Sequence, residues 1–145
     1  MENKLRFSKI LFLCVANSAR SQMAEFIAKK IFPAEFEIKS AGSRPGTRVH
    51  SLAIETTSSF NPEIATAEPK DISALGKDFL NANCLVIRLC AEEECPIVTE
   101  KIEIRDWNLP DPAQPADGDL NLAFVDTLKI LIERIQKLKT EMVPS

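Results

Sequence analysis

Cys14 and Arg20 are the residues whose types and spacing best suit catalysis. They belong to a C-x5-R-S segment that follows an apolar stretch and precedes an amphipathic one. A loop that turns from a strand into a helix points several backbone N–H groups inward, and together with the positive helix start it binds a tetrahedral oxyanion. The planar guanidinium of Arg20 matches two oxygens of such an anion. The same positive field favours a Cys14 thiolate, which makes Cys14 a nucleophile.

We expect every residue that follows Cys14 in the C-x5-R-S segment to line the site of the oxyanion. The oxyanion-binding residues are therefore Val15, Ala16, Asn17, Ser18, Ala19, Arg20 and Ser21. Within the loop, the Ser21 hydroxyl can donate to the thiolate and Asn17 can hold the loop's shape. A lone C-x5-R would fit a structural cysteine at a strand end. The strand before, the helix after and the serine behind the arginine favour the nucleophile.

The elements that must hold this loop alternate between strands and helices. Lys9–Cys14 is short, apolar and bounded by polar residues, which is typical of a buried strand in a parallel sheet. Apolar residues then recur at helical spacing from about Arg20 to Ile31. Further strands are predicted at Phe36–Ser40, at Cys84–Leu89 and, as a short one, at Ile102–Ile104.

Helices and loops are predicted for the rest. Ser51 is expected to cap a short helix, and Asp71–Leu80 has a weak helical pattern. Three prolines make Asn108–Gly118 a long loop. Apolar residues from Phe124 to Met142 step at helical spacing, so a helix that begins near Asp119 should dock on the sheet.

This alternation predicts the fold class. It indicates an α/β protein with a parallel sheet, helices on both faces and a single domain over residues 1–145. In such folds ligands bind beyond the carboxyl ends of the strands. Cys14 lies at the carboxyl end of the first strand, where a ligand is expected.

Composition excludes several classes of function. The chain has 145 residues with 18 Lys+Arg and 21 Asp+Glu, and a formal charge of -3, so nucleic acid is not an expected partner. The apolar run Ile10–Ala16 is far shorter than the roughly 20 residues of a membrane span. It ends near Arg20, where a signal peptide would have small residues. We therefore expect a cytoplasmic protein with reduced cysteines, in which any disulfide is transient and catalytic.

Four further segments form a family pattern around the C-x5-R-S loop. They are Gln22–Glu25, Ser40–Ser43, Val49–Ala53, with Ser51 where proline is usual, and Trp107–Pro112. Together they resemble the low-molecular-weight protein-tyrosine phosphatase superfamily, and most closely its arsenate reductase branch. The resemblance covers the whole chain and is weakest from Thr56 to Lys77. It implies a flavodoxin-like three-layer fold with a four-stranded parallel sheet and the oxyanion loop, or P-loop, after the first strand.

Asp111 matches the general acid of this superfamily. It lies in the W-x-x-x-D-P pattern of residues 107–112. A proton donor is needed when a thiolate displaces an oxide or alkoxide from arsenic or phosphorus. An ordinary Asp-Pro turn is the plainer interpretation, and the C-x5-R-S loop favours the acid.

Cys90 and Cys95 indicate which oxyanion is the substrate. In the arsenate reductase branch, a cysteine at the end of the third strand attacks the arsenylated nucleophile, and a second cysteine resolves the disulfide. Thiol–disulfide exchange can supply the two electrons that the reduction needs. The spacing is shorter here than in thioredoxin-linked relatives, and Ala19 replaces a second loop cysteine. One alternative is that Cys90 and Cys95 form half of a zinc site that His50 helps to complete. Another is that the two cysteines are thiols without a function. Cys84 is expected in the core.

The sequence thus predicts a thiol-dependent arsenate reductase, with Cys14 as nucleophile and Cys90 and Cys95 as the redox relay. No tightly bound cofactor is expected, and the reductant is thioredoxin, or glutaredoxin or a small thiol. The first alternative is a phosphatase that acts on phosphotyrosine or a small phosphoester through a phosphocysteine. The chain has no Tyr, and no aromatic residue comes directly after Pro112, whereas phosphotyrosine recognition needs aromatic walls. The second alternative is a silent oxyanion-binding regulatory module.

A cation is a further expectation from the resemblance. Asn17, Glu25 and Ser40 match positions that bind potassium in some arsenate reductases. We expect at most a weak potassium site there and no other metal.

Overall fold

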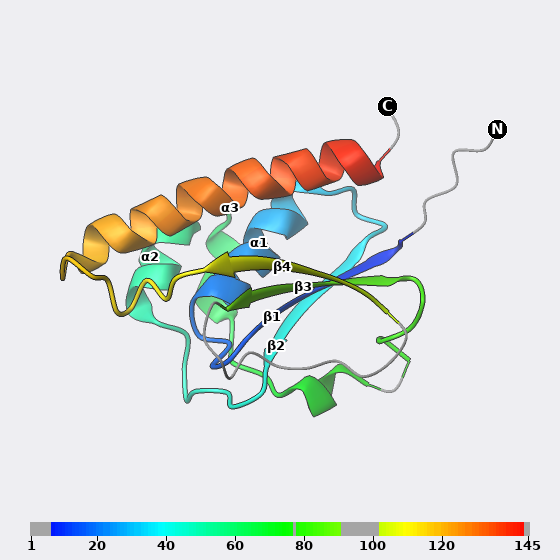
Figure 1. The fold of residues 1–145 in the computed structure, drawn as a ribbon, viewed down its shortest axis with the longest axis horizontal. Coiled ribbons are helices and arrows are strands. Elements are labelled where there is room, and N and C mark those ends of the chain that lie inside the picture. Colours follow the sequence, from blue (N-terminus) through cyan, green and yellow to red (C-terminus); the bar gives the residue numbers. More distant parts are fainter. Residues whose placement is uncertain (1–6, 77, 91–101, 144–145) are drawn as a thin grey trace.

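Four parallel strands form the centre of the molecule. The computed structural model describes residues 7–76, 78–90 and 102–143. The sheet has the order β2-β1-β3-β4 (Figure 1). Its strands are β1 Lys9–Cys14, β2 Glu37–Gly42, β3 Cys84–Cys90 and β4 Glu103–Leu109. The predicted α/β flavodoxin-like fold with a four-stranded parallel sheet is confirmed.

The three α-helices of the described chain cover one face of this sheet (Figure 1). They are α1 Arg20–Ile31, α2 Ser51–Ser58 and α3 Leu120–Met142. Two short 3-10 helices follow α2: η1 Pro62–Thr66 near that helix, and η2 Ile72–Leu75 on the opposite face of the sheet. The second outer layer, within the described residues, is therefore thin. No helix in the described ranges is long and apolar enough to cross a membrane.

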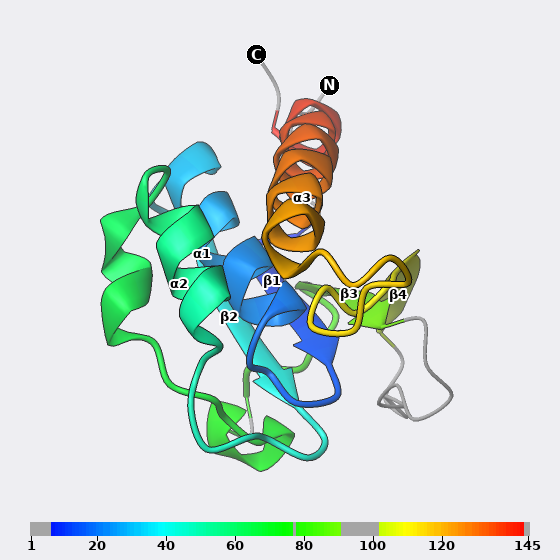
Figure 2. The same cartoon turned by 90° about the vertical axis from the view of Figure 1, so that its left-hand side faces the viewer.

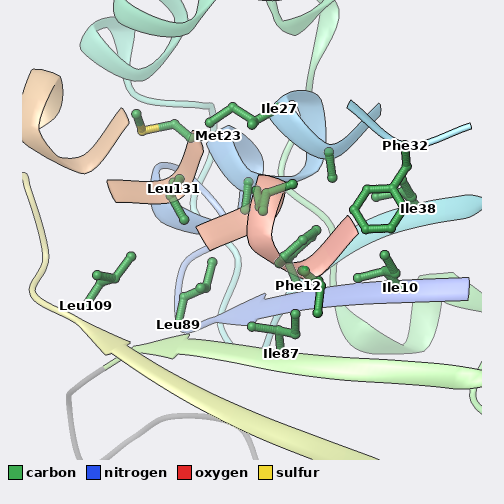
Figure 3. Close-up of a cluster of buried hydrophobic side chains, with 14 of the residues drawn as sticks. Ile10, Phe12, Met23, Ile27, Phe32, Ile38, Ile87, Leu89, Leu109 and Leu131 are labelled. Carbon is green, nitrogen blue, oxygen red and sulfur yellow. The ribbon is translucent and has the colours of Figure 1, made fainter. Parts of the chain in front are cut away.

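Alternation along the strands divides the core into two parts. Ile10, Phe12 and Ile87 face the helices, where Figure 3 shows them together with Met23 and Leu131. On the other face, a smaller cluster packs under η2. Its buried members are Leu11, Leu13, Ala41, Leu75, Phe79, Cys84 and Val86. Because Cys14 is an even-numbered residue of β1, like Ile10 and Phe12, its side chain lies on the helix side.

Two predicted elements differ from the structure. The weak helix over Asp71–Leu80 is only the 3-10 turn η2, because Gly76 takes a φ of 91° directly after it. The short strand at Ile102–Ile104 is instead β4, Glu103–Leu109. Its polar middle was not recognised as a strand, since the extended conformation there is fixed by pairing with β3.

The cap of α2 also differs from the prediction. Ser51 is the first helical residue rather than the cap. The cap is His50, whose Nδ1 accepts a hydrogen bond from the Leu52 N–H at 3.1 Å. The ring of His50 also lies 4.7 Å from that of the buried Phe124 of α3, measured between centroids. Serine is usually preferred at the N-cap of a helix. Here packing against α3 favours histidine at that position, residue 50.

Gly42 ends β2 where the loop after β1 passes closest to it. A Cβ at this position would overlap the carbonyl oxygen of Val15 and lie 3.0 Å from the backbone nitrogen of Asn17. Glycine is therefore required here by the close approach of the loop's backbone.

We expect Gly42→Ala to push this loop out of place. Overpacking of this kind typically costs about 1–3 kcal/mol of unfolding free energy, and phosphate binding should weaken with it. Gly46→Ala is the matched control, because its Cβ would meet its nearest neighbour, the Ser18 Cβ, at 3.9 Å. Urea unfolding and calorimetric titration with phosphate measure both effects. Equal behaviour of the two variants would contradict the steric argument.

Candidate functional site

The C-x5-R-S segment lies at the carboxyl end of β1, as the sequence predicts. Cys14 is the last residue of β1 and Arg20 the first of α1, so residues 15–19 make the whole turn. Figure 2 shows this blue loop at the same end of the sheet as the yellow segment that joins β4 to α3. The P-loop and the Asp111 loop therefore meet at one edge, where the strands end.

The carbonyl groups of the P-loop point toward residues 44–50. The carbonyls of Val15, Ala16 and Ser18 accept hydrogen bonds from the N–H groups of Arg44, Gly46 and His50 at 3.0, 2.9 and 2.7 Å. A trans peptide holds its carbonyl and the following N–H on opposite sides. The N–H groups that follow these three carbonyls therefore point away from residues 44–50.

Those N–H groups are available to a ligand. Among the residues that the structure describes, none accepts a hydrogen bond from the N–H groups of residues 16–19. The start of α1 adds the positive end of the helix dipole. This arrangement suits a tetrahedral oxyanion, which is the ligand that the sequence predicts.

The side chain of Asn17 fixes the shape of the loop. It is fully buried, and its backbone takes the left-handed conformation with a φ of 52°. Its amide nitrogen donates to the hydroxyls of Ser21 at 2.8 Å and Ser40 at 3.0 Å. Its amide oxygen accepts from the Gln22 side chain at 2.9 Å and from the Lys70 N–H at 2.8 Å. These four hydrogen bonds tie the loop to α1, to β2 and to the segment before η2.

Cys14 contacts Ser21 directly. The distance from Cys14 Sγ to Ser21 Oγ is 2.8 Å, and both residues are buried. Ser21 Oγ accepts from the Asn17 amide, and its own proton can be donated to the sulfur. The hydroxyl is thus within hydrogen-bonding distance of the sulfur that the sequence predicts to be the nucleophile.

Glu25, one of the three residues expected at a cation, lies at the far end of the same network. Its carboxylate accepts from the Ser40 hydroxyl at 2.6 Å. It also pairs with the ammonium groups of Lys29 at 2.6 Å and Lys70 at 3.6 Å. Asn17, Glu25 and Ser40 are thus brought together, and two lysines neutralise the carboxylate. The described ranges contain no cluster of three His, Cys, Asp or Glu residues suited to a metal.

Arg20 connects the P-loop to the loop that carries Asp111. It is 4% exposed, and its Nη1 donates to the carbonyl of Leu109 at 2.9 Å. Asp111 follows two residues later, half-buried, and its carboxylate accepts the Ala113 N–H at 3.0 Å in a local turn. Trp107 packs instead against Phe12, with ring centroids 6.3 Å apart, and lies partly buried against the core.

The cysteines fall into two states. Cys14 and Cys84 are free and buried, whereas Cys90 is disulfide-bonded. Cys95 lies outside the described residues. Cys90 pairs with Leu109 of β4 at the ends of the two strands.

Beside this strand end, two hydrogen bonds between Arg88 and Asp106, of 2.6 and 2.9 Å, lower the pKa of the Asp106 carboxyl. Arg88 and Asp106 are cross-strand neighbours, so this pair joins β3 to β4 just before Cys90.

Comparison with known proteins fits this geometry. The sequence model for the low molecular weight phosphotyrosine protein phosphatases matches residues 9–143. The chain belongs to this family. Among its relatives is the arsenate reductase of Bacillus subtilis, 35% identical over 119 residues that span 79% of this chain and 78% of the relative.

Two solved structures of arsenate reductases are also similar to this chain. An arsenate reductase in a phosphate-binding state has a TM-score of 0.72 at 27% identity, with 94% of this chain and 99% of that one covered. The thioredoxin-dependent arsenate reductase of Corynebacterium glutamicum has a TM-score of 0.71 at 26% identity, with 94% of this chain and 62% of that one covered.

Some residues of the site were not identified in the sequence. Lys70 supports Asn17 and Glu25 from a distant part of the chain, and no local pattern distinguishes it from other lysines. Residues 44–50 were predicted only as a loop, although they hold three P-loop carbonyls. Gln22 had a usable signal, because it follows Arg20 and Ser21 directly in the family pattern.

We expect iodoacetate to distinguish the two free cysteines of the native protein. Burial raises the pKa of Cys84 to about 12. That thiol therefore stays protonated, and unreactive, until the pH approaches this value. At pH 8 the anionic reagent should modify Cys14, and inorganic phosphate should slow the reaction. Peptide mass spectrometry locates the label, with urea-unfolded protein as the control in which both react. Labelling of native Cys84 at pH 8 would contradict this assignment.

Proposed function

We propose that this chain is a thiol-dependent arsenate reductase in which Cys14 is the nucleophile, and that its 145 residues act as one domain. The cradle of N–H groups at residues 16–19 beside Cys14 and Arg20 is the observation that carries the proposal. It suits arsenate and phosphate alike. The disulfide-bonded Cys90 at the neighbouring strand end favours redox chemistry, as do relatives that are arsenate reductases.

The first step forms a bond between sulfur and arsenic. The Cys14 thiolate attacks arsenic, and one arsenate oxygen leaves as water after taking a proton from Asp111. The N–H groups of the loop and the guanidinium of Arg20 hold the remaining oxygens, whose negative charge would otherwise repel the thiolate. Because Arg20 also holds the Leu109 carbonyl, the anion and the acid loop are positioned by one side chain.

The second step reduces arsenic. The Cys90 thiolate attacks Cys14 Sγ, a sulfur–sulfur bond forms, and the electron pair of the sulfur–arsenic bond passes to arsenic. Arsenic(V) becomes arsenic(III) and leaves as arsenite, while two thiols become one disulfide. Cys95 then attacks Cys90, which releases Cys14 as a thiolate and leaves a Cys90–Cys95 disulfide.

An external dithiol completes the cycle. It reduces the last disulfide and becomes a disulfide itself. The net reaction converts arsenic acid and a dithiol into arsenous acid, a disulfide and one water, so that atoms and electrons balance. A free Cys14 next to a disulfide-bonded Cys90 is the state expected before this reduction. We propose thioredoxin, or glutaredoxin with a small thiol, as the reductant, and the cytoplasm as the compartment where such thiols stay reduced.

Phosphatase activity is the second candidate function. Cys14, Arg20 and Asp111 suffice for phosphomonoester hydrolysis through a phosphocysteine. The family that matches the chain is named for phosphotyrosine protein phosphatases, which favours retention of this chemistry. The redox cysteines have no part in it, and this difference separates the two reactions.

We expect Cys90→Ser to separate them by experiment. Aryl phosphate hydrolysis should survive, because attack on phosphorus does not involve Cys90. Arsenate turnover should fall at least about a hundredfold, within the range that loss of an essential catalytic group produces, since arsenylated Cys14 would lack its resolving thiol. Arsenate-dependent NADPH oxidation, coupled to thioredoxin and its reductase or to glutaredoxin and glutathione, measures turnover.

Cys14→Ser is the control and should abolish both activities while phosphate still binds. Full arsenate turnover in the Cys90→Ser protein, with no disulfide between Cys90 and Cys14 or Cys95 in the wild type, would make the phosphatase the better assignment.

Asp111→Asn tests proton donation. A basic alkoxide needs a proton to leave, whereas a nitrophenolate hardly does. We expect an alkyl phosphate to lose about 10²–10⁴-fold in rate and a nitrophenyl phosphate much less. Asparagine retains an oxygen that can accept the Ala113 N–H, so the loop should keep its shape. Small and equal losses for both esters would show that Asp111 is only a turn residue.

A further inference from the structure

The exposed apolar side chains of α3 lie next to the site and have no role in the chemistry above. Across the described residues, the large hydrophobic side chains that are clearly exposed are Leu120, Leu122, Val125 and Ile130. All of them belong to the first half of one helix, over about 16 Å at 1.5 Å per residue. Exposed apolar residues that gather in this way mark an interaction site more often than scattered ones do.

A groove runs along this half of the helix. It lies between α3 and the loop that follows β4, with a volume of about 520 Å³. Its apolar walls include Leu109, Pro112, Leu122 and Ile130, and Asp111 lines it as well. Figure 2 shows the yellow loop next to the orange start of α3, and residues of both segments line the groove. The groove therefore includes the loop that carries Asp111.

The charged residues of the groove are all acidic. Asp111, Asp117 and Asp126 line it, and no lysine, arginine or histidine is among its described lining residues. A complementary surface would carry an apolar centre with basic residues around it, since opposite potentials speed encounter and set register. Free arsenate is an anion and would be repelled here, so the groove does not fit the oxyanion itself.

The position of the groove indicates which partner it fits. Leu109, at its inner end, is the strand partner of the disulfide-bonded Cys90. Neighbouring strands lie about 4.8 Å apart, so a protein that reduces a disulfide at Cys90 has this groove beside its point of attack. Transient redox encounters bury less than about 1,200 Å², which suits a patch of this length better than a permanent dimer does.

We infer that this groove docks the electron donor, a dithiol protein of the thioredoxin fold whose active-site face is apolar with a basic rim. The inference rests on the proposed arsenate reductase function and names the partner of that same site. Leu122 and Ile130 supply the apolar contact, and Asp117 and Asp126 supply the charge that orients the donor.

Two pairs of substitutions on one helix test the contact. Leu122→Ser with Ile130→Ser removes the groove's apolar wall, at side chains that are 48% and 36% exposed and hence should not affect folding. Leu120→Ser with Val125→Ser is the matched control, because these residues are 40% and 37% exposed and do not line the groove. Arsenate-dependent NADPH oxidation is measured over a range of thioredoxin concentrations with thioredoxin reductase, and repeated with dithiothreitol as the donor.

The groove pair should raise the KM for thioredoxin about tenfold, the size of effect that truncation at an interface centre produces. Turnover with saturating dithiothreitol should stay within twofold of the wild type, as should both activities of the control pair. A KM that does not change, or an equal loss with dithiothreitol, would overturn the docking site. The docking site would also be overturned if small thiols supported arsenate turnover while thioredoxin and glutaredoxin did not.

Charge reversal provides an independent readout. Asp117→Lys with Asp126→Lys should lower kcat/KM for thioredoxin about tenfold and should reduce the salt dependence of kcat/KM. Glu133→Lys is the control, because Glu133 does not line the groove, and it should leave kcat/KM and its salt dependence unchanged.

Sedimentation tests whether a second copy of the chain occupies the groove. If the wild type were a dimer and the Leu122→Ser, Ile130→Ser protein were not, the groove would be assigned to a second copy instead. If the wild type reduces no arsenate with any thiol, the proposed function fails; if it does and the groove variants match it, only the docking inference fails.

Discussion

The four hydrogen bonds of the Asn17 side chain are the constraint on which the site depends. They hold a non-glycine residue with a φ of 52° inside the turn between β1 and α1. Asparagine tolerates this backbone better than most residues do. With the turn fixed, carbonyls face residues 44–50 and N–H groups face the ligand side. The N–H groups that we propose to bind the oxyanion are therefore already oriented by the protein itself.

The same network also joins Cys14 to the buried Glu25 carboxylate. The amide of Asn17 donates to both serines, Ser40 donates to Glu25, and the Ser21 hydroxyl lies within hydrogen-bonding distance of Cys14 Sγ. Two lysines balance the charge of the Glu25 carboxylate at the buried end. A buried carboxylate is costly unless it is paired, and these two lysines provide the pairing for Glu25.

The second half of the site is joined to the first through Arg20. The only other non-glycine residue of the described chain with a positive φ is Asn108, at 49°, which turns the end of β4 toward Asp111. Arg20 then holds the carbonyl of the next residue, Leu109. Cys14, the Asp111 loop and Leu109, which is the strand partner of Cys90 and lines the groove, consequently share one edge of the sheet. The groups that the proposed reaction uses therefore lie close together at this edge.

The sequence by itself determined the features that depend on local pattern. The apolar run of β1, the helical spacing of α1 and α3, and the turn between Cys14 and Arg20 were each predicted at nearly the observed bounds. Only the tertiary structure decided the rest, because it depends on contacts between distant residues. β4 is extended through its polar middle since it pairs with β3, and His50 caps α2 while packing against Phe124. Lys70 reaches Asn17 across 53 positions of the chain, a contact that no local periodicity encodes.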